Sequence, residues 1–200
     1  MLGKAPDGLN CLTIAEKAVQ KGYAVGIYSS DYSTSATPSA FYAHALNRND
    51  NETIIKQKEK AALSMDIEVP VGKISDSVVE RLKKISSQSD KKGFFVMFEG
   101  AFIDSFSHGN QIDGMKQELY DFDTAVMKAA LFVDEYPETT LIVLADHETG
   151  GLNNECVFTT FDHTAADTPV YAYGKHAELF SGTQDNTEIH YKMEKILFNE

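Results

Sequence analysis

Two short, wholly apolar runs separated by a long amphipathic segment constrain the fold of this chain more than any other feature. The runs occupy 94–98 and 141–145, and five residues are far fewer than the roughly 20 that a membrane-spanning helix needs. Such runs are typical of parallel strands covered on both faces. Between them, apolar residues recur at spacings of three and four, which predicts one long helix. These residues are Ile112, Met115, Leu119, Phe122, Val126, Ala130 and Val133.

The N-terminal part of the chain predicts two helices and a strand. Residues 13–16 have the T-x-x-E form of a capping box, and Gly22 suits a left-handed C-terminal cap, so a helix of about nine residues is expected. A β-rich strand follows at 24–28. Pro38 is expected to open a second helix that continues through Asn47, because proline fits the first turn of a helix.

The remaining elements complete an alternation of strands and helices. Pro70 argues against a central strand in the stretch 67–72. The other expected elements are helices at 52–63 and 75–85 and a strand at 170–173. This alternation predicts an α/β fold with a mostly parallel sheet and helices on both faces.

Composition and charge narrow the choice of partners. The 200 residues are 42% hydrophobic, which is enough for one domain with a core, so we expect a single domain over 1–200. The net charge of -12 repels a phosphate backbone, and we expect neither nucleic acid nor a membrane as a partner. The first ten residues lack the apolar segment of a secretory signal peptide, so none is expected in this chain.

Carboxylates and histidines follow the predicted strands. Ligands of open α/β sheets bind beyond the carboxyl ends of the strands, and zinc accepts imidazole nitrogen together with carboxylate oxygen. An isolated histidine is more often a surface or core residue than a ligand. Two Asp/His pairs, each beyond an apolar strand, instead favour a metal site. The residues in question are Glu99, Asp104 and His108 after the first run, Asp146 and His147 after the second, and His163 in the loop before 170–173.

Four segments resemble those of the alkaline phosphatases, in the order that the family has them. Residues 94–104 with His108 resemble "GFF...EG..ID...H", 145–151 resemble "ADHETGG", 163–174 resemble "HT....P.YAYG", and 36–44 with Arg48 resemble the "ATPAAFYAH...R" helix. The resemblance implies an alkaline-phosphatase-like fold and the hydrolysis of phosphate monoesters. It also implies a homodimer and a periplasmic or extracellular location.

The same resemblance implies a centre of two zinc ions and one magnesium ion. Two close metals can clamp the attacking and leaving oxygens of a phosphoryl transfer, and a guanidinium fork matches two phosphate oxygens. The implied residues are Asp104, His108 and His163 for one zinc, Asp146 and His147 for the second, Thr37 and Glu99 for magnesium, and Arg48 for the substrate phosphate.

The chain also departs from the family pattern. The serine that the family phosphorylates, in a "DSA.TAT" segment, has no match in these residues, and neither has the early aspartate that bridges the second zinc and the magnesium. Ser35 stands where an acid or histidine is common. Between Arg48 and Glu99 the chain is short, so 49–92 is interpreted as a shortened variable insert. We therefore expect an incomplete, C-terminal part of the fold.

Two alternatives to a phosphomonoesterase remain open at this point. A truncated, catalytically silent protein that binds metal or phosphate would carry the same residues. A phosphodiesterase or phosphomutase of the wider superfamily would share the Asp/His pattern, but it would not be expected to share the helix with Thr37, Pro38 and Arg48.

Overall fold

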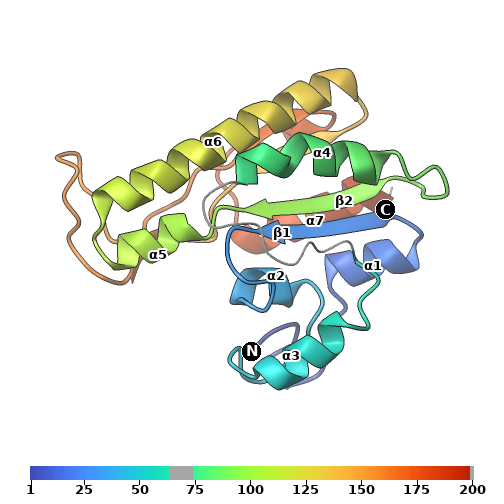
Figure 1. Ribbon diagram of the computed structural model, residues 1–200, viewed down its shortest axis with the longest axis horizontal. Coiled ribbons are helices and arrows are strands. Elements are labelled where there is room, and N and C mark those ends of the chain that lie inside the picture. Colours follow the sequence, from blue (N-terminus) through green and yellow to red (C-terminus); the bar gives the residue numbers. More distant parts are fainter. Residues whose placement is uncertain (64–73, 199–200) are drawn as a thin grey trace. The chain divides into compact units, whose positions relative to one another are not determined.

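The computed structural model describes residues 1–63 and 74–198 (Figure 1). The chain divides into two compact units. Unit 1 comprises 1–74 and 80–99, and unit 2 comprises 75–79 and 100–200. Helices and short strands alternate along both units, so the predicted α/β class is confirmed. The assignment of one domain with a shortened insert at 49–92 stays a prediction.

A parallel pair of strands forms the centre of unit 1. Strands β1 (Ala24–Ser29) and β2 (Phe94–Glu99) lie side by side in register from Ala24 opposite Phe94 to Ser29 opposite Glu99 (Figure 1). All six residues of β1 are buried, whereas all six of β2 are half-buried. The apolar run at 94–98 predicts a strand that is covered on both faces. In the structure this strand, β2, is covered only in part, and its neighbour β1 is the fully buried one.

Helix α1 (Ile14–Gln20) confirms the capping box. The Thr13 hydroxyl accepts a hydrogen bond from the Glu16 amide at 3.1 Å, and the Thr13 amide donates to the Glu16 carboxylate at 2.9 Å. Gly22 follows with a φ of 87°, a conformation that glycine adopts without steric cost. Both ends of this helix are thus set by residues within it or next to it.

Helix α2 (Ala36–Ala40) is shorter than predicted, and the expected continuation through Asn47 is wrong. The amides of residues 41–43 still donate to carbonyls three or four positions earlier, but the backbone then pairs with a distant segment. Leu2 and Ala45 exchange amide-to-carbonyl bonds of 2.8 and 3.1 Å. The apolar side chains there form a small core with α3, and burying them in it takes the place of further helical turns. That core contains Leu2, Tyr42, Ala43, Ala45 and Ile54.

The next two helices match their predicted positions approximately. Helix α3 (Asn51–Lys58) begins after Asp50, whose carboxylate accepts from the Thr53 amide at 3.1 Å, and it ends five residues before the predicted boundary at 63. Helix α4 (Ile74–Ser86) covers the second predicted helix. The stretch 67–72 lies outside the described residues.

Unit 2 holds the remaining elements, and its strands pair antiparallel. Strand β3 pairs with β6, and β4 pairs with β5. The expectation of a mostly parallel sheet holds for β1 and β2 but not here, because parallel neighbours need a crossover that is usually a helix, and no helix lies between β3 and β6. The elements are α5 (Phe102–His108), α6 (Ile112–Glu135), β3 (Thr140–Val143), β4 (Glu148–Thr149), β5 (His163–Thr164), β6 (Tyr171–Gly174), the 3-10 helix η1 (Ala177–Phe180) and α7 (Asn186–Phe198).

The long helix α6 confirms the prediction made from its periodicity, with one shift of its buried face. Leu119, expected inside, is 45% exposed, whereas its neighbour Glu118 is 4% exposed. Helix α6 contacts α5 as well as β3 and β6, so different parts of its surface are covered by different neighbours. None of the described helices is both long and apolar enough to cross a membrane.

Candidate metal centre

Helix α5 presents two of the predicted zinc ligands. Asp104 lies in its first turn and His108 in its last, and residues four apart lie on the same helix face. Gly100 precedes the helix where a side chain would not fit, since an added Cβ would lie 2.9 Å from the Phe122 ring. The path of the backbone into α5 therefore requires a glycine at position 100.

The third predicted ligand, His163, comes from the hairpin of β4 and β5. The turn after β4 contains Gly150 and Gly151, with φ values of 91° and 58°. Glu148 stabilises this turn, because its carboxylate accepts from the Gly151 amide at 2.9 Å and from the Thr164 hydroxyl. These bonds fix β5, and with it His163, against β4.

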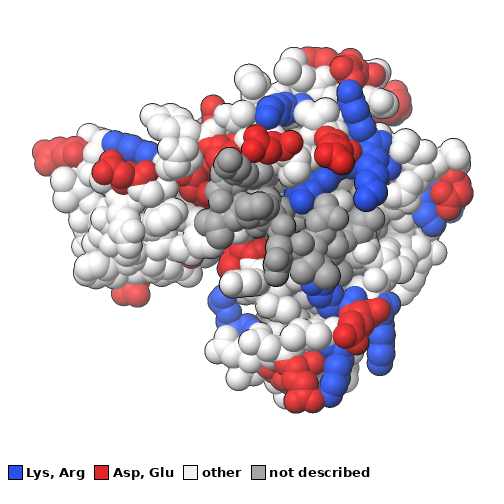
Figure 2. Space-filling view, viewed as in Figure 1, with Lys and Arg blue, Asp and Glu red and all other residues white. Residues whose placement is uncertain are grey.

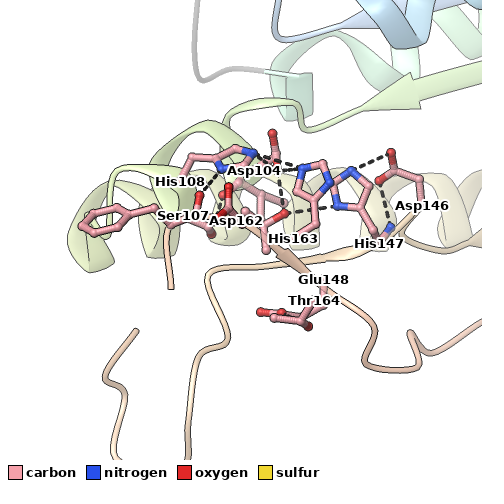
Figure 3. Close-up of polar contacts among 12 residues, drawn as sticks. Asp104, Ser107, His108, Asp146, His147, Glu148, Asp162, His163 and Thr164 are labelled. Carbon is pink, nitrogen blue, oxygen red and sulfur yellow. Dashed lines mark hydrogen bonds and ion pairs between the residues drawn. The ribbon is translucent and has the colours of Figure 1, made fainter. Parts of the chain in front are cut away.

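The three side chains converge on one point (Figure 3), with ligand atoms all within 4.8 Å of one another. The two Nε2 atoms of His108 and His163 are 3.0 Å apart. Asp104 Oδ1 lies 3.5 Å from the first and 3.7 Å from the second. The side chains are 39 to 48% exposed, so the cluster is open to solvent.

The hydrogen bonds around His108 suit a metal ligand. Its Nδ1 contacts the carbonyl oxygen of Phe161, which can only accept, so Nδ1 carries a proton and Nε2 of the neutral ring carries a lone pair. That lone pair points toward the Asp104 carboxylate, which also only accepts. A cation between such acceptors relieves their repulsion, and two imidazoles with one carboxylate fit zinc.

The second predicted zinc pair lies directly beside this cluster. His147 stacks on His163 with ring centroids 3.6 Å apart, and Figure 3 shows the two rings next to each other. His147 Nε2 is 3.2 Å from Asp146 Oδ2, and the Asp146 side chain is 78% exposed. The structure thus brings all five predicted zinc ligands into one region of unit 2, with three protein ligands at one position and two at the other.

The predicted magnesium and phosphate residues belong to unit 1. Glu99 ends β2, and its carboxylate accepts from the Ser29 hydroxyl at 2.5 Å. Thr37 lies within α2. Arg48 is exposed in a turn beyond the point where α2 ends, which corrects the expectation that a helix precedes it.

The sequence did not predict the residues that contact the predicted metal ligands and fix their positions. Glu148, Thr149 and the Phe161 carbonyl contact ligand side chains or the turn that carries them. In the sequence, Thr149 belongs to the segment 145–151 that resembles the family, and no role of its own is predicted for it. The threonine two residues after an Asp-His pair is the available signal, because metal-bound imidazoles usually donate their other ring N–H to a second polar group.

Comparison with known proteins identifies the class to which this fold and site belong. The family model described as alkaline phosphatase matches residues 1–71, 66–161 and 153–198. The chain therefore belongs to the alkaline phosphatase family, a family of phosphatases.

Relatives of known name agree with this assignment. Alkaline phosphatase 3 of Bacillus subtilis (strain 168) is 25% identical over an alignment that covers 92% of this chain and 70% of the relative. The alkaline phosphatase of Escherichia coli (strain K12) is 29% identical, over 64% of this chain and 31% of its own length. Streptomycin-6-phosphate phosphatase of Streptomyces griseus is 31% identical, over 49% of this chain and 28% of its own length. The chain therefore matches less than a third of the latter two relatives.

Solved structures show the same fold. The alkaline phosphatase of the Antarctic bacterium TAB5 superposes with a TM-score of 0.86 at 26% identity, over 98% of this chain and 78% of that one. A variant of the TAB5 enzyme with magnesium bound in its M3 site gives a TM-score of 0.88 at 25% identity, with the same coverage.

Proposed function

We propose that this chain carries the metal- and phosphate-binding residues of a phosphomonoesterase of alkaline phosphatase type. The observation that supports this most is the convergence of the Asp104 carboxylate with ring nitrogens of His108 and His163, in segments that match the family. In this proposal these three residues hold one zinc ion. Asp146 and His147 hold a second zinc, and Thr37 and Glu99 hold a magnesium ion.

The residues of the chain support the chemistry in three ways. When bound, the metal ions supply the positive charge that stabilises an in-line phosphoryl transfer. The Asp104 and Asp146 carboxylates offset that charge, and the carbonyl of Phe161 keeps the His108 lone pair directed inward. Arg48 is exposed, and its planar guanidinium group is proposed to bind two oxygens of the substrate phosphate. The partial exposure of the zinc ligands leaves room for a phosphate ester to approach.

Small phosphate monoesters are the proposed substrates. One relative is named for a phosphorylated small molecule, streptomycin 6-phosphate. On the face shown in Figure 2, lysine and arginine side chains are mixed with aspartate and glutamate, and the net charge is -12. Both features favour a small ester over nucleic acid or an anionic membrane. A homodimer and a periplasmic or extracellular location follow from the family resemblance alone.

A catalytically silent protein that binds metal and phosphate is the alternative. It is favoured by one observation, namely that no segment of these 200 residues matches "DSA.TAT". Covalent transfer needs an activated nucleophile in line with the leaving group. The 200-residue chain is therefore expected not to transfer phosphate to an alcohol acceptor such as Tris. Transfer to Tris, or an acid-stable phosphoserine, would show that another serine serves as the nucleophile.

Metal analysis combined with phosphate titration tests the proposal. After extensive dialysis the chain should retain about one zinc ion, because among the described residues only the cluster of Asp104, His108 and His163 offers three ligand groups. Inorganic phosphate should bind the zinc-loaded chain and not the zinc-free chain, in calorimetry. Asp104→Asn, checked for folding by circular dichroism, should lose both properties.

The outcomes separate the candidates. No retained zinc, two or more tightly retained zinc ions, or phosphate binding that does not depend on zinc contradicts the ligand assignment. Slow release of inorganic phosphate from an aryl phosphate monoester supports the phosphomonoesterase. Zinc-dependent phosphate binding without any hydrolysis supports the silent alternative.

A further inference from the structure

The side chain of Thr149 lies between the two proposed zinc positions. It ends strand β4 and is 9% exposed. Its hydroxyl oxygen is 2.6 Å from Asp104 Oδ1 and 3.1 Å from His147 Nδ1. One hydroxyl therefore contacts a predicted ligand of each zinc ion, across 45 residues of sequence in the case of Asp104.

The single proton of the hydroxyl decides the direction of both hydrogen bonds. The Asp104 carboxylate only accepts, so the Thr149 hydroxyl donates to it. The hydroxyl oxygen is then an acceptor toward His147, and Nδ1 of His147 must carry the donated proton. In the neutral ring this places the lone pair on Nε2, which faces Asp146 Oδ2 at 3.2 Å, and a cation between these two acceptors would relieve their repulsion.

We infer that Thr149 is a positioning residue that orients Asp104 at one zinc position and selects the metal-binding tautomer of His147 at the other. This inference rests on the proposed zinc centre. A β-branched residue suits the task because its χ1 angle is restricted in a strand, which limits the positions that the hydroxyl oxygen can take. Partners of this kind typically change metal affinity by about 10- to 100-fold when they are removed.

Two substitutions at this position distinguish the hydroxyl from the shape of the side chain. Thr149→Val keeps the branched shape and removes the hydroxyl, whereas Thr149→Ser keeps the hydroxyl. We expect Thr149→Val to weaken zinc binding by about 10- to 100-fold in chelator competition, and Thr149→Ser to stay within a few-fold of the parent chain.

Nitrogen-15 NMR of the zinc-free chain supplies a readout that does not depend on zinc. The Asp146 carboxylate favours a proton on Nε2 of His147, and the Thr149 hydroxyl oxygen favours one on Nδ1. The fraction of the Nδ1–H tautomer in the neutral ring should therefore be larger in the parent and in Thr149→Ser than in Thr149→Val. Thr164→Val is the matched control, because Thr164 lies on the paired strand and donates to Glu148 rather than to a ligand. It should lower stability without changing the His147 signal.

The results separate this inference from the proposed function. Failure of the parent chain to bind zinc contradicts the zinc centre, and the NMR comparison still tests the hydrogen bonds of Thr149. If Thr149→Val binds zinc as the parent does and leaves the His147 tautomer unchanged, Thr149 has no positioning role. An equal change of the His147 signal in Thr164→Val assigns the effect to the stability of the hairpin instead.

Discussion

The two units of the chain carry their predicted functional residues in different ways. In unit 2 the three predicted ligands of one zinc ion, Asp104, His108 and His163, come from one short helix and one tight hairpin, and their ligand atoms lie within 4.8 Å of one another. In unit 1 the predicted residues come from three separate elements: Thr37 from α2, Glu99 from the end of β2, and Arg48 from an exposed turn. A site built from adjacent short elements can be preformed by local hydrogen bonds, whereas one built from separate elements depends on their packing.

The first and largest test of this comparison is the loss of a zinc ligand. His163→Ala should weaken zinc binding by at least about 100-fold, because it leaves two of three protein ligands. Glu99→Gln should leave tight zinc binding within about two-fold, since its proposed metal is magnesium and its glutamine can still accept from Ser29. Chelator competition measures both variants. Equal losses in the two variants would mean that zinc binding does not reside in unit 2 alone.

Arg48 tests whether unit 1 binds phosphate through geometry or only through charge. Arg48→Lys keeps the charge but loses the planar fork, so inorganic phosphate should bind the zinc-loaded chain about 10-fold more weakly. Arg48→Gln, which loses the charge as well, should bind phosphate more weakly still. Calorimetric titration gives both affinities. A lysine variant equal to the parent would mark Arg48 as an ordinary surface residue of the turn.

The contrast between the two units also shows how far the sequence determines the structure. The T-x-x-E box of α1 and the spacing of Asp104 and His108 are patterns within one turn or two of helix, so their geometry follows from nearby residues. The early end of α2 could not be predicted, because it depends on the pairing of Ala45 with Leu2. The spacing of nearby residues predicts local geometry, but it gives no information about pairing with a distant segment of the chain.

The same limit explains what was missed around the metal centre. Motifs predict the five proposed zinc ligands, but the link between Thr149 and Asp104 joins residues 45 positions apart. Likewise, the exposed Leu119 and the buried Glu118 show that periodicity finds a helix without fixing which neighbour covers each part of it. Motifs therefore predict candidate ligands, and the structure adds the residues that contact them.

The hairpin that carries His163 should be sensitive to a single methyl group. Gly151 has a φ of 58°, and an added Cβ would lie 2.3 Å from the Thr159 hydroxyl oxygen. Gly151→Ala should therefore lower the free energy of unfolding by about 1–3 kcal/mol and weaken zinc binding with it. Gly182→Ala is the control, because Gly182 has a φ of 82° with nothing within 4 Å. It should cost only about 1–2 kcal/mol of conformational strain and leave zinc binding unchanged.

The smallest expected effect is on stability in alkaline solution, and it is tested by comparing one tyrosine from each unit. Burial raises the pKa of Tyr42 in unit 1 from 10.0 to about 12. Its hydroxyl donates to the Ser33 carbonyl at 2.7 Å, and the residue is 3% exposed. In unit 2, Tyr173 is 48% exposed, and its hydrogen bond to Asp134 raises its pKa.

The sign of the pH effect follows from which state loses its proton first. The unfolded chain releases the Tyr42 proton near pH 10.0, while the folded chain holds it until about pH 12. Stability from this group is complete below pH 10.0 and falls as the pH rises toward 12. Urea unfolding across this range should show a steeper decline for the parent than for Tyr42→Phe. Tyr173→Phe should leave the decline of stability with pH nearly unchanged, because solvent screens the interaction between the exposed Tyr173 hydroxyl and the Asp134 carboxylate. An equal flattening in both variants would mean that Tyr42 is not the group through which alkali destabilises unit 1.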